Sequence, residues 1–383
     1  MESRKGLILI IAIFTGFILA STSDLSSAQD TYKIGGLYDL KGHLSWLGEY
    51  YRKAGELAVE MINEAGGIKG KKLEIIIYDT ESKPEESVRA ANRLIERDKV
   101  LGLTGTATVP NTAAVGQIAN KVRIPAVLSS GYEIDHAVDK FVFNTANRNE
   151  YAMGKAFEWY KNHGIKKVAL LMVLGPLGEA GIKTCERIAP QYGITLVATE
   201  RFDTLAADVT PQLANLRTKN PEAIYSFTTG KPAALIARNM EQMGLKIPVG
   251  VSHGNATPGF LKIVEGITVK ILVPTGKIMV VNEVPADDPT KPILVEFNNR
   301  HMKKYGEPAN YFSGLVRDAV VLLSEGIKVG GNNPPKIRDA IENVKGLKGV
   351  SGIFNMSPTD HYGLKMSDMV VIEPSGSKWA LSK

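Results

Sequence analysis

The sequence contains a single cysteine, Cys185, so the chain cannot form an internal disulfide. This residue lies in the run GIKTCERIA, whose spacing is helical, and the favoured interpretation is a small buried core residue. A reactive thiol is the alternative, but no accompanying His or Asn pattern marks a nucleophile. A scaffold held together by disulfides is therefore excluded.

The sequence also lacks the motifs that carry common enzyme chemistry. It has no G-x-S-x-G elbow, no P-loop and no H-E-x-x-H segment. Its histidines never fall in the spacing of metal ligands; they are His43, His136, His163, His253, His301 and His361. We therefore expect a protein that is not an enzyme and that needs no metal or cofactor. An enzyme remains the alternative that a turnover assay would reveal.

Basic charge is not concentrated in any one segment. Lys and Arg exceed Asp and Glu by 46 to 40, but pairs such as Lys71-Lys72 and Lys166-Lys167 are scattered and lack neighbouring aromatics. Nucleic-acid binding requires a basic patch, so no nucleic-acid partner is expected. A mild attraction for anionic solutes is compatible with the net charge of +6.

Long apolar runs are absent except near the start, where Leu7 to Ala20 carries no charge. As a helix this run spans roughly 21 Å, less than the hydrocarbon core of about 30 Å. Arg4 and Lys5 precede it, and Ser26-Ser27-Ala28 follows with small residues that suit a signal peptidase. We expect a signal peptide over residues 1–28 and export to the periplasm; a retained membrane anchor is the alternative.

Apolar strands alternate with amphipathic helices along the rest of the chain. A first set of strands is predicted at 33–37, 73–78, 100–104 and 125–129, and a second set at 167–173, 194–199, 224–228 and 249–252. Continuous apolar strands separated by helices indicate parallel sheets covered on both faces. Two successive sets predict two doubly wound α/β domains.

Loops at the carboxyl ends of such strands are where ligands bind. Three predicted loops have this position, at residues 40–46, 105–111 and 129–134, and the last two are rich in Ser and Thr. Free N–H groups at a helix start attract an anion, and a hydroxyl adds a donor. The loops could form a cradle for a carboxylate, or they could be ordinary helix caps.

Several segments resemble a known family. They are KIGGLYDLKG, AVEMINEAGGIKGKKLEIIIYDTESKPEESVRAANRLI, RIPAV, NTANRNEY and GITVKILVPTG. Together they resemble the leucine/isoleucine/valine-binding receptors of ABC importers, which have the type I periplasmic binding protein fold. The resemblance implies two Rossmann-like lobes joined by three crossovers, one of residues 31–145 plus 276–356 and the other of 146–275 plus 357–383. It also implies a small-molecule ligand, a membrane permease as partner, and a monomer.

The resemblance further implies where the ligand lies. The loop that holds the ligand carboxylate in the family corresponds to Thr106, Ala107 and Thr108, and the next loop to Ser130 and Tyr132. In the second lobe, the corresponding positions are Leu177, Thr228, Thr229 and His253.

One departure from the family pattern concerns the ligand's ammonium group. The acid that pairs with it should lie in GVSHGNA, which contains His253 but no carboxylate. A buried ammonium without an anionic partner costs several kcal/mol. We therefore predict an aromatic or other organic carboxylate, with Trp46, Tyr132 and Leu177 lining a flat apolar pocket. An exposed rim position for Trp46 and a purely structural His253 are the alternatives.

Two other functions stay open at this point. One is the classical branched-chain amino acid receptor that the resemblance implies. The other is a sensor in which the same ligand-binding protein signals to a membrane receptor instead of supplying a permease. The sequence does not separate transport from sensing, because both use exposed surfaces of the lobes.

Overall fold

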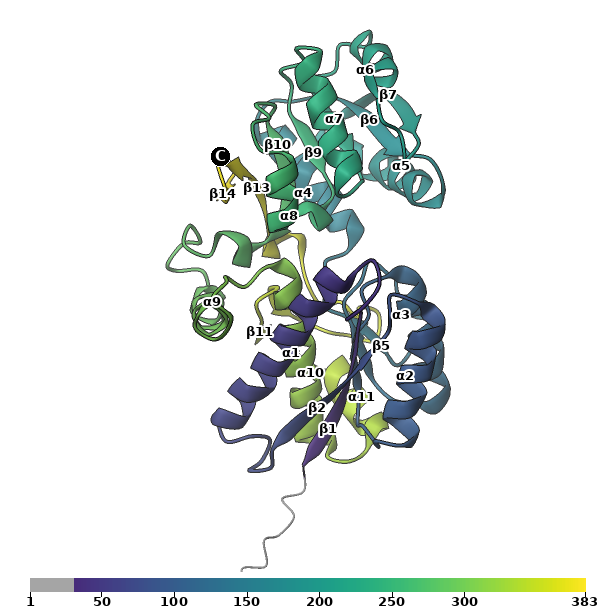
Figure 1. Cartoon of the computed structure of the whole chain (residues 1–383), viewed down its shortest axis with the longest axis vertical. Helices are drawn as coiled ribbons and strands as arrows, with labels where there is room; N and C mark the ends of the chain where they lie inside the picture. The colour runs from purple at the N-terminus through teal and green to yellow at the C-terminus, as the bar shows by residue number, and fades with distance from the viewer. Residues whose placement is uncertain (1–30) are drawn as a thin grey trace, which may run out of the picture. The chain divides into compact units, whose positions relative to one another are not determined.

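The computed structural model describes residues 31–383, and the predicted signal peptide with its cleavage site lies outside them. Two separate sheets organise these residues (Figure 1). The first is parallel throughout, in the order β2-β1-β3-β4-β5. Its strands are β1 (Tyr32–Tyr38), β2 (Leu73–Asp79), β3 (Leu103–Gly105), β4 (Ala126–Leu128) and β5 (Val142–Asn144). We call this sheet and its helices the amino-terminal lobe.

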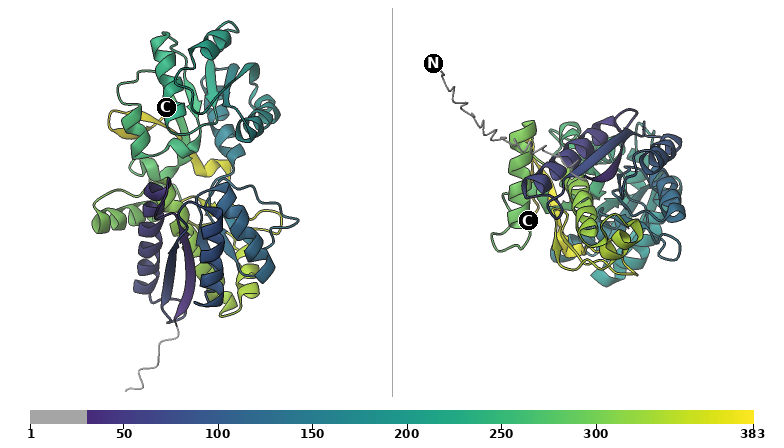
Figure 2. Two further views of the ribbon diagram at one scale, coloured as in Figure 1. Left: turned by 45° about the vertical axis from the view of Figure 1, so that its right-hand side comes forward. Right: turned by 90° about the horizontal axis from the view of Figure 1, so that it is seen from below.

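Helices cover both faces of the first sheet (Figure 2). One face packs against α1 (Ser45–Glu64), α10 (Tyr311–Gly330) and α11 (Pro334–Glu342), and the other against α2 (Pro84–Glu96) and α3 (Val109–Val122). One face of α1 is apolar and buried, with Leu47, Tyr51, Ala54, Leu57 and Ala58 among its buried residues. Apolar strands buried on both sides explain why the periodicity alone predicted this layer order.

The second sheet has the order β14-β13-β10-β9-β8-β6-β7 and forms the carboxy-terminal lobe. Five strands are parallel: β6 (Lys167–Val173), β7 (Thr195–Phe202), β8 (Ala223–Ser226), β9 (Val249–Val251) and β10 (Ile271–Gly276). The strands β13 (Met369–Ser375) and β14 (Lys378–Leu381) add an antiparallel edge. The lobe's helices are α4 (Asn149–Asn162), α5 (Pro176–Ile188), α6 (Thr210–Arg217), α7 (Lys231–Gln242) and α8 (Pro258–Ile263).

The chain passes between the two sheets three times: after β5, after β10 and before β13. Between the second and third passages lie α9 (Lys291–Tyr305), α10, α11 and a small hairpin of β11 (Leu347–Lys348) and β12 (Ile353–Phe354). Short 3-10 helices occur at η1 (Ala189–Tyr192), η2 (His253–Asn255), η3 (Lys277–Val280) and η4 (Met366–Asp368). The expected α/β class is therefore confirmed.

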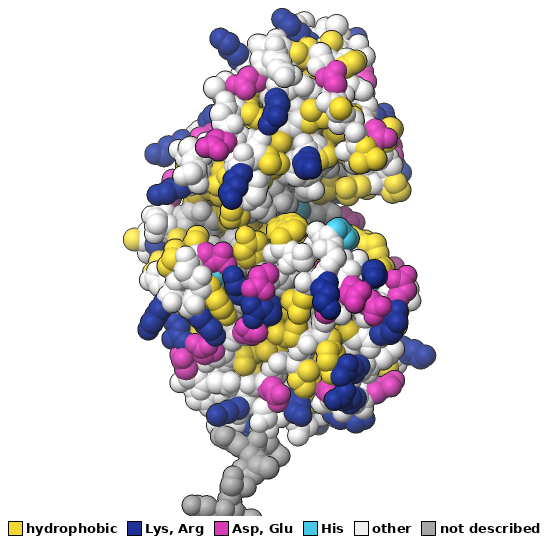
Figure 3. All heavy atoms as spheres, viewed as in Figure 1, with side chains coloured by type: hydrophobic (Ala, Val, Ile, Leu, Met, Phe, Trp, Pro, Cys, Tyr) yellow, Lys and Arg dark blue, Asp and Glu magenta, His cyan; other side chains and the backbone are white. Residues whose placement is uncertain are grey.

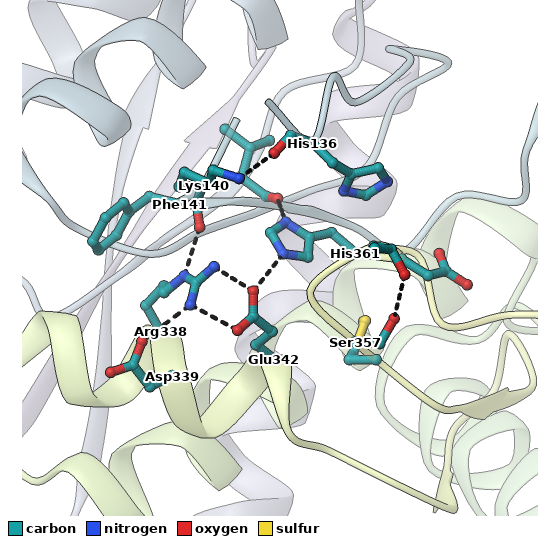
Figure 4. A network of polar contacts seen from close by, with 12 residues as sticks. His136, Lys140, Phe141, Arg338, Asp339, Glu342, Ser357 and His361 are labelled. Carbon is teal, nitrogen blue, oxygen red and sulfur yellow. Dashed lines mark hydrogen bonds and ion pairs between the residues drawn. The ribbon is translucent and has the colours of Figure 1, made fainter. Parts of the chain in front are cut away.

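The third crossover begins later in the chain than the sequence indicated. Tyr362 and Leu364 are buried in the core of the amino-terminal lobe. His361 joins them: its Nδ1 lies 2.8 Å from the Val142 carbonyl and its Nε2 3.0 Å from the Glu342 carboxylate (Figure 4). The amino-terminal lobe thus extends past the predicted boundary at residue 356. The turn-rich sequence of this segment gave no sign of the buried contacts.

Cys185 is fully buried in α5, with its sulfur 3.9 Å from Met153 Sδ. Burial raises the pKa of its thiol, so it is a core residue, as expected, and not a thiolate nucleophile. Among the helices of residues 31–383, none is both long and apolar enough to span a bilayer.

Candidate functional site

A chain of three hydroxyl groups lies where β3 and β4 end. Thr106 Oγ1 is 2.7 Å from Thr112 Oγ1, which is 2.7 Å from Ser130 Oγ. All three residues are buried. Ser130 Oγ also accepts a hydrogen bond from the Tyr132 backbone N–H at 3.2 Å. The structure therefore joins the two Ser/Thr loops that the sequence singled out.

The number of O–H donors shows whether these three hydroxyl groups can bind a ligand. Three hydroxyls carry three O–H donors, and the two hydrogen bonds that connect them use only two. One O–H is left to donate, whichever direction the chain runs. A carboxylate accepts such a bond readily, because hydrogen bonds to charged groups are stronger than neutral ones.

The start of α3 adds to this hydroxyl-rich loop. Thr108 is its N-cap, and the Thr108 side chain accepts from the Asn111 N–H at 3.2 Å. Its hydroxyl is thus engaged in capping, which was the alternative interpretation for these loops. Ala107 lies between the two threonines and is partly buried. Thr106 has a φ of +58°, in the left-handed region, which turns the loop sharply at the strand end.

Two of the three predicted wall residues have well-defined neighbours. The Tyr132 hydroxyl donates to Asp139 Oδ2 at 2.9 Å, and the ring packs against the core that includes α3. Trp46 is 47% exposed and packs edge-on to Tyr50 and Phe312, at 6.3 and 5.9 Å between ring centroids. The role of both residues as pocket walls stays a prediction.

In the carboxy-terminal lobe, Asn255 connects the two loops that carry Thr228, Thr229 and His253. Its side chain accepts from the Gly230 N–H at 2.7 Å and donates to the Thr228 carbonyl at 2.8 Å. Thr228 is buried and Thr229 exposed. Leu177, in the first turn of α5, is 55% exposed.

His253 lies among aromatic rings. Its ring centroid is 6.2 Å from that of Phe227 and 5.9 Å from that of Tyr311. Its Nδ1 has no hydrogen-bond partner among the described residues. Burial lowers the pKa of His253 to about 4, so the imidazole is neutral near pH 7.

Three site residues were missed by the sequence interpretation. Tyr311, at the start of α10, lies against His253 and bonds through its hydroxyl to the side chain of Asn147 at 3.3 Å. Asn147 is buried in the first crossover, and its Nδ2 has no partner among the described residues. Asp39, buried directly after β1, is the third. Only the position of Asp39 after a strand could have marked it.

The surface of the described chain is hollowed between the lobes, with a histidine and hydrophobic side chains at the edge of the hollow (Figure 3). A separate cavity of about 690 Å³ lies beside η3 and includes Met279, Met302 and Trp379 but none of the predicted site residues. Within residues 31–383, no cluster of three or more His, Cys, Asp or Glu side chains could hold a metal ion.

Two α/β lobes joined by three crossovers, with loops at the strand ends forming the site, define the type I periplasmic binding protein fold. The sequence matches the periplasmic binding protein family over residues 31–377, and the chain belongs to that family.

Similar proteins agree with this assignment. A leucine-, isoleucine-, valine-, threonine- and alanine-binding protein of Pseudomonas aeruginosa is 25% identical over 356 residues, which cover 88% of this chain and 89% of that protein. A solved Rhodopseudomonas palustris protein superimposes with a TM-score of 0.81 at 24% identity, covering 92% of this chain and 100% of its own. The substrate-binding protein of a branched-chain amino acid transporter from Streptococcus pneumoniae, solved with isoleucine, superimposes with a TM-score of 0.76 at 23% identity. The match covers 91% of this chain and 97% of that protein. The resemblance noted from the sequence is thus confirmed.

Proposed function

We propose that this protein captures a small organic carboxylate, in particular an aromatic one, between its lobes in the periplasm and delivers it as a monomer to the permease of an ABC importer. The observation that carries the proposal is His253, a neutral imidazole among aromatic rings at the position where the family resemblance implies an acid.

His253 argues against a ligand with an ammonium group. Burial is the cause of its lowered pKa, with no carboxylate contributing. A neutral imidazole offers an ammonium no charge, and a protonated one would repel it. An uncharged or apolar part of the ligand suits this position better.

The amino-terminal lobe supplies groups for the opposite, anionic end of the ligand. The hydroxyl chain of Thr106, Thr112 and Ser130 has one O–H left to donate. The amino terminus of α3, just after Thr108, adds a partial positive charge. Carboxylates are stabilised by both features.

Aromatic side chains support a ring in the ligand. Phe227 and Tyr311 flank His253, and Phe312 continues from Tyr311 towards Trp46. Aromatic rings attract one another in edge-to-face arrangements, worth about 0.5–1.5 kcal/mol per pair beyond simple burial.

The names of the similar proteins favour a second candidate, a branched-chain amino acid receptor. A thermal-shift panel separates the two, because a bound ligand raises the melting temperature by mass action. We expect benzoate and related acids to raise it, and leucine, isoleucine and valine to leave it unchanged. Strong stabilisation by leucine, without any by aromatic acids, would refute the carboxylate proposal.

An experiment in cells distinguishes a transport function from a sensing function. Deletion of the gene should abolish uptake of the radiolabelled acid that the panel identifies, and plasmid-borne protein should restore it. Normal uptake in the deletion strain, with loss of a transcriptional response to the acid, would instead identify a sensor.

A further inference from the structure

Asp39 is a buried carboxyl group beneath the anion-binding loops. It follows β1 directly and is fully buried. Its Oδ1 accepts from the Thr80 hydroxyl at 2.7 Å and from the Asn111 amide at 3.4 Å. Asn111 is in the first turn of α3, and so Asp39 contacts the element whose amino terminus faces the proposed ligand carboxylate.

The other oxygen of this carboxyl group has no donor in good hydrogen-bonding geometry within the described part of the chain. Asp39 Oδ2 is buried without a hydrogen-bond partner among the described residues, and so is Asn111 Oδ1. The Asn111 amide nitrogen bonds to Asp39 Oδ1, so the two unpartnered oxygens belong to two residues in contact. A proton on Asp39 Oδ2 turns one of these acceptors into a donor.

No cationic side chain of residues 31–383 pairs with Asp39. The described residues form no salt bridge to it, and the nearby Lys41 ammonium pairs with Asp79 at 3.7 Å instead. From α1 it faces Tyr51, a neutral phenol whose own pKa is raised well above its usual range. A buried carboxylate without a counter-ion is costly, and the usual outcome is protonation.

The balance of local effects raises the pKa of Asp39. Burial raises it more than the Thr80 hydrogen bond and the weaker contacts from Ser82 and the backbone N–H of Ala107 lower it. Ala107 is in the anion-binding loop itself. An ionised Asp39 would both repel a ligand carboxylate and compete with it for that N–H group.

We infer that Asp39 is a proton-dependent positioning residue: it is a neutral acid while the cleft holds an anionic ligand, and its ionisation weakens the binding of that ligand. The inference rests on the proposed function, since it needs a ligand that carries a carboxylate. If Asp39 acts in this way, the protein binds the anionic ligand most tightly at acidic pH and releases it more easily at alkaline pH.

The test is calorimetric titration of benzoate between about pH 5 and pH 9, a range in which acid–base linkage can be followed. Benzoate is an anion throughout, and His253, with a pKa of about 4, stays neutral. For the wild type, we expect the dissociation constant to rise by up to about tenfold per pH unit once Asp39 ionises. Asp39→Asn, which imitates the neutral acid, should show constant affinity, and Asp287→Asn on an exposed loop should behave as the wild type.

Infrared spectroscopy of the ligand-free protein gives a second readout. A carbonyl band of a protonated carboxyl group should be present in the wild type and Asp287→Asn and absent from Asp39→Asn. Absence of the band, a pH-independent wild-type affinity, or a pH dependence that persists in Asp39→Asn would overturn the inference. If Asp39→Asn does not fold, a pH-independent wild-type affinity or a missing wild-type band would still overturn the inference. Failure of benzoate to bind at any pH would refute the proposed function, and the infrared band would still report the proton on Asp39.

Discussion

The imidazole of His253 and the phenol of Tyr311 meet edge-on, with ring centroids 5.9 Å apart and planes inclined at 79°. His253 belongs to the carboxy-terminal lobe and Tyr311 to the amino-terminal lobe, so this contact joins the two halves of the proposed site. Because the neighbour of the imidazole is a ring and not a carboxylate, His253 stays neutral. The selectivity that we propose depends on this relationship.

Replacing His253 by glutamate should change the preferred ligand. A carboxylate at this position would attract an ammonium and repel a second carboxylate. We expect His253→Glu to bind benzoate at least about tenfold more weakly, or about 1.4 kcal/mol, and to gain affinity for leucine, as measured by calorimetry. His253→Gln is the matched control and should keep the preference for acids. Equal weakening in both variants would mean that His253 acts by shape alone.

The depressed pKa of His253 makes stability depend on pH. An unfolded histidine takes up a proton near pH 6.5, whereas the folded residue resists it until about pH 4. Stability is therefore unaffected above about pH 6.5 and falls as the pH drops towards 4, by up to about 3 kcal/mol from this group. Urea unfolding should be measured above about pH 6.5 and near pH 4. Between these two conditions, the wild type should lose more free energy of unfolding than His253→Gln does. The difference isolates His253, because His136 and His301, whose pKa values are also lowered, are common to both.

Removing the hydroxyl of Thr112, the middle one of the three connected hydroxyl groups, should affect both the stability of the protein and its binding of the ligand. Thr112→Val keeps the shape of the side chain but leaves Thr106 and Ser130 without their shared partner. We expect a loss of about 1–3 kcal/mol in the free energy of unfolding, from buried hydroxyls left unpaired, and weaker binding of benzoate. Thr184→Val, at a half-buried helix position whose hydroxyl donates to the Ala180 carbonyl, should destabilise the protein less than Thr112→Val does. Unchanged affinity in Thr112→Val would remove the hydroxyl chain from the ligand site.

Tyr132→Phe tests whether the Tyr132 hydroxyl serves the fold or the ligand. The variant loses the hydrogen bond to Asp139, and so the free energy of unfolding should fall by about 1 kcal/mol. Affinity for aromatic acids should remain within about twofold, since the hydroxyl is already bonded to Asp139. A large loss of affinity with intact stability would show that the hydroxyl contacts the ligand.

The sequence predicted the fold well because apolar strands and helix faces are local patterns. The strands predicted at 73–78 and 167–173 were both found in this way. Short elements such as β5 and α11 were missed, because three to nine residues carry too little periodicity. The late third crossover was missed as well, since the buried contacts of His361 join residues far apart in the sequence.

Only part of the site could be predicted in the same way. Thr106 and Ser130 stay predicted ligand residues; the pattern of Ser and Thr after a strand singled out their loops, which the structure brings together. Tyr311 and Asn147 were not, because their hydrogen bond joins α10 to the first crossover and depends on the tertiary fold. The direction of the Tyr132 ring was likewise set by a partner, Asp139, that no local pattern identifies.

The central claim is that the ligand has a carboxylate but no ammonium group. Two pairs of compounds test it most directly by calorimetry: leucine against 4-methylpentanoate, and phenylalanine against 3-phenylpropanoate. Each pair differs only in the α-ammonium group. We predict that at least one acid binds at least about tenfold more tightly than its amino acid, a difference of about 1.4 kcal/mol. Tighter binding of leucine or phenylalanine than of its desamino counterpart would contradict the account.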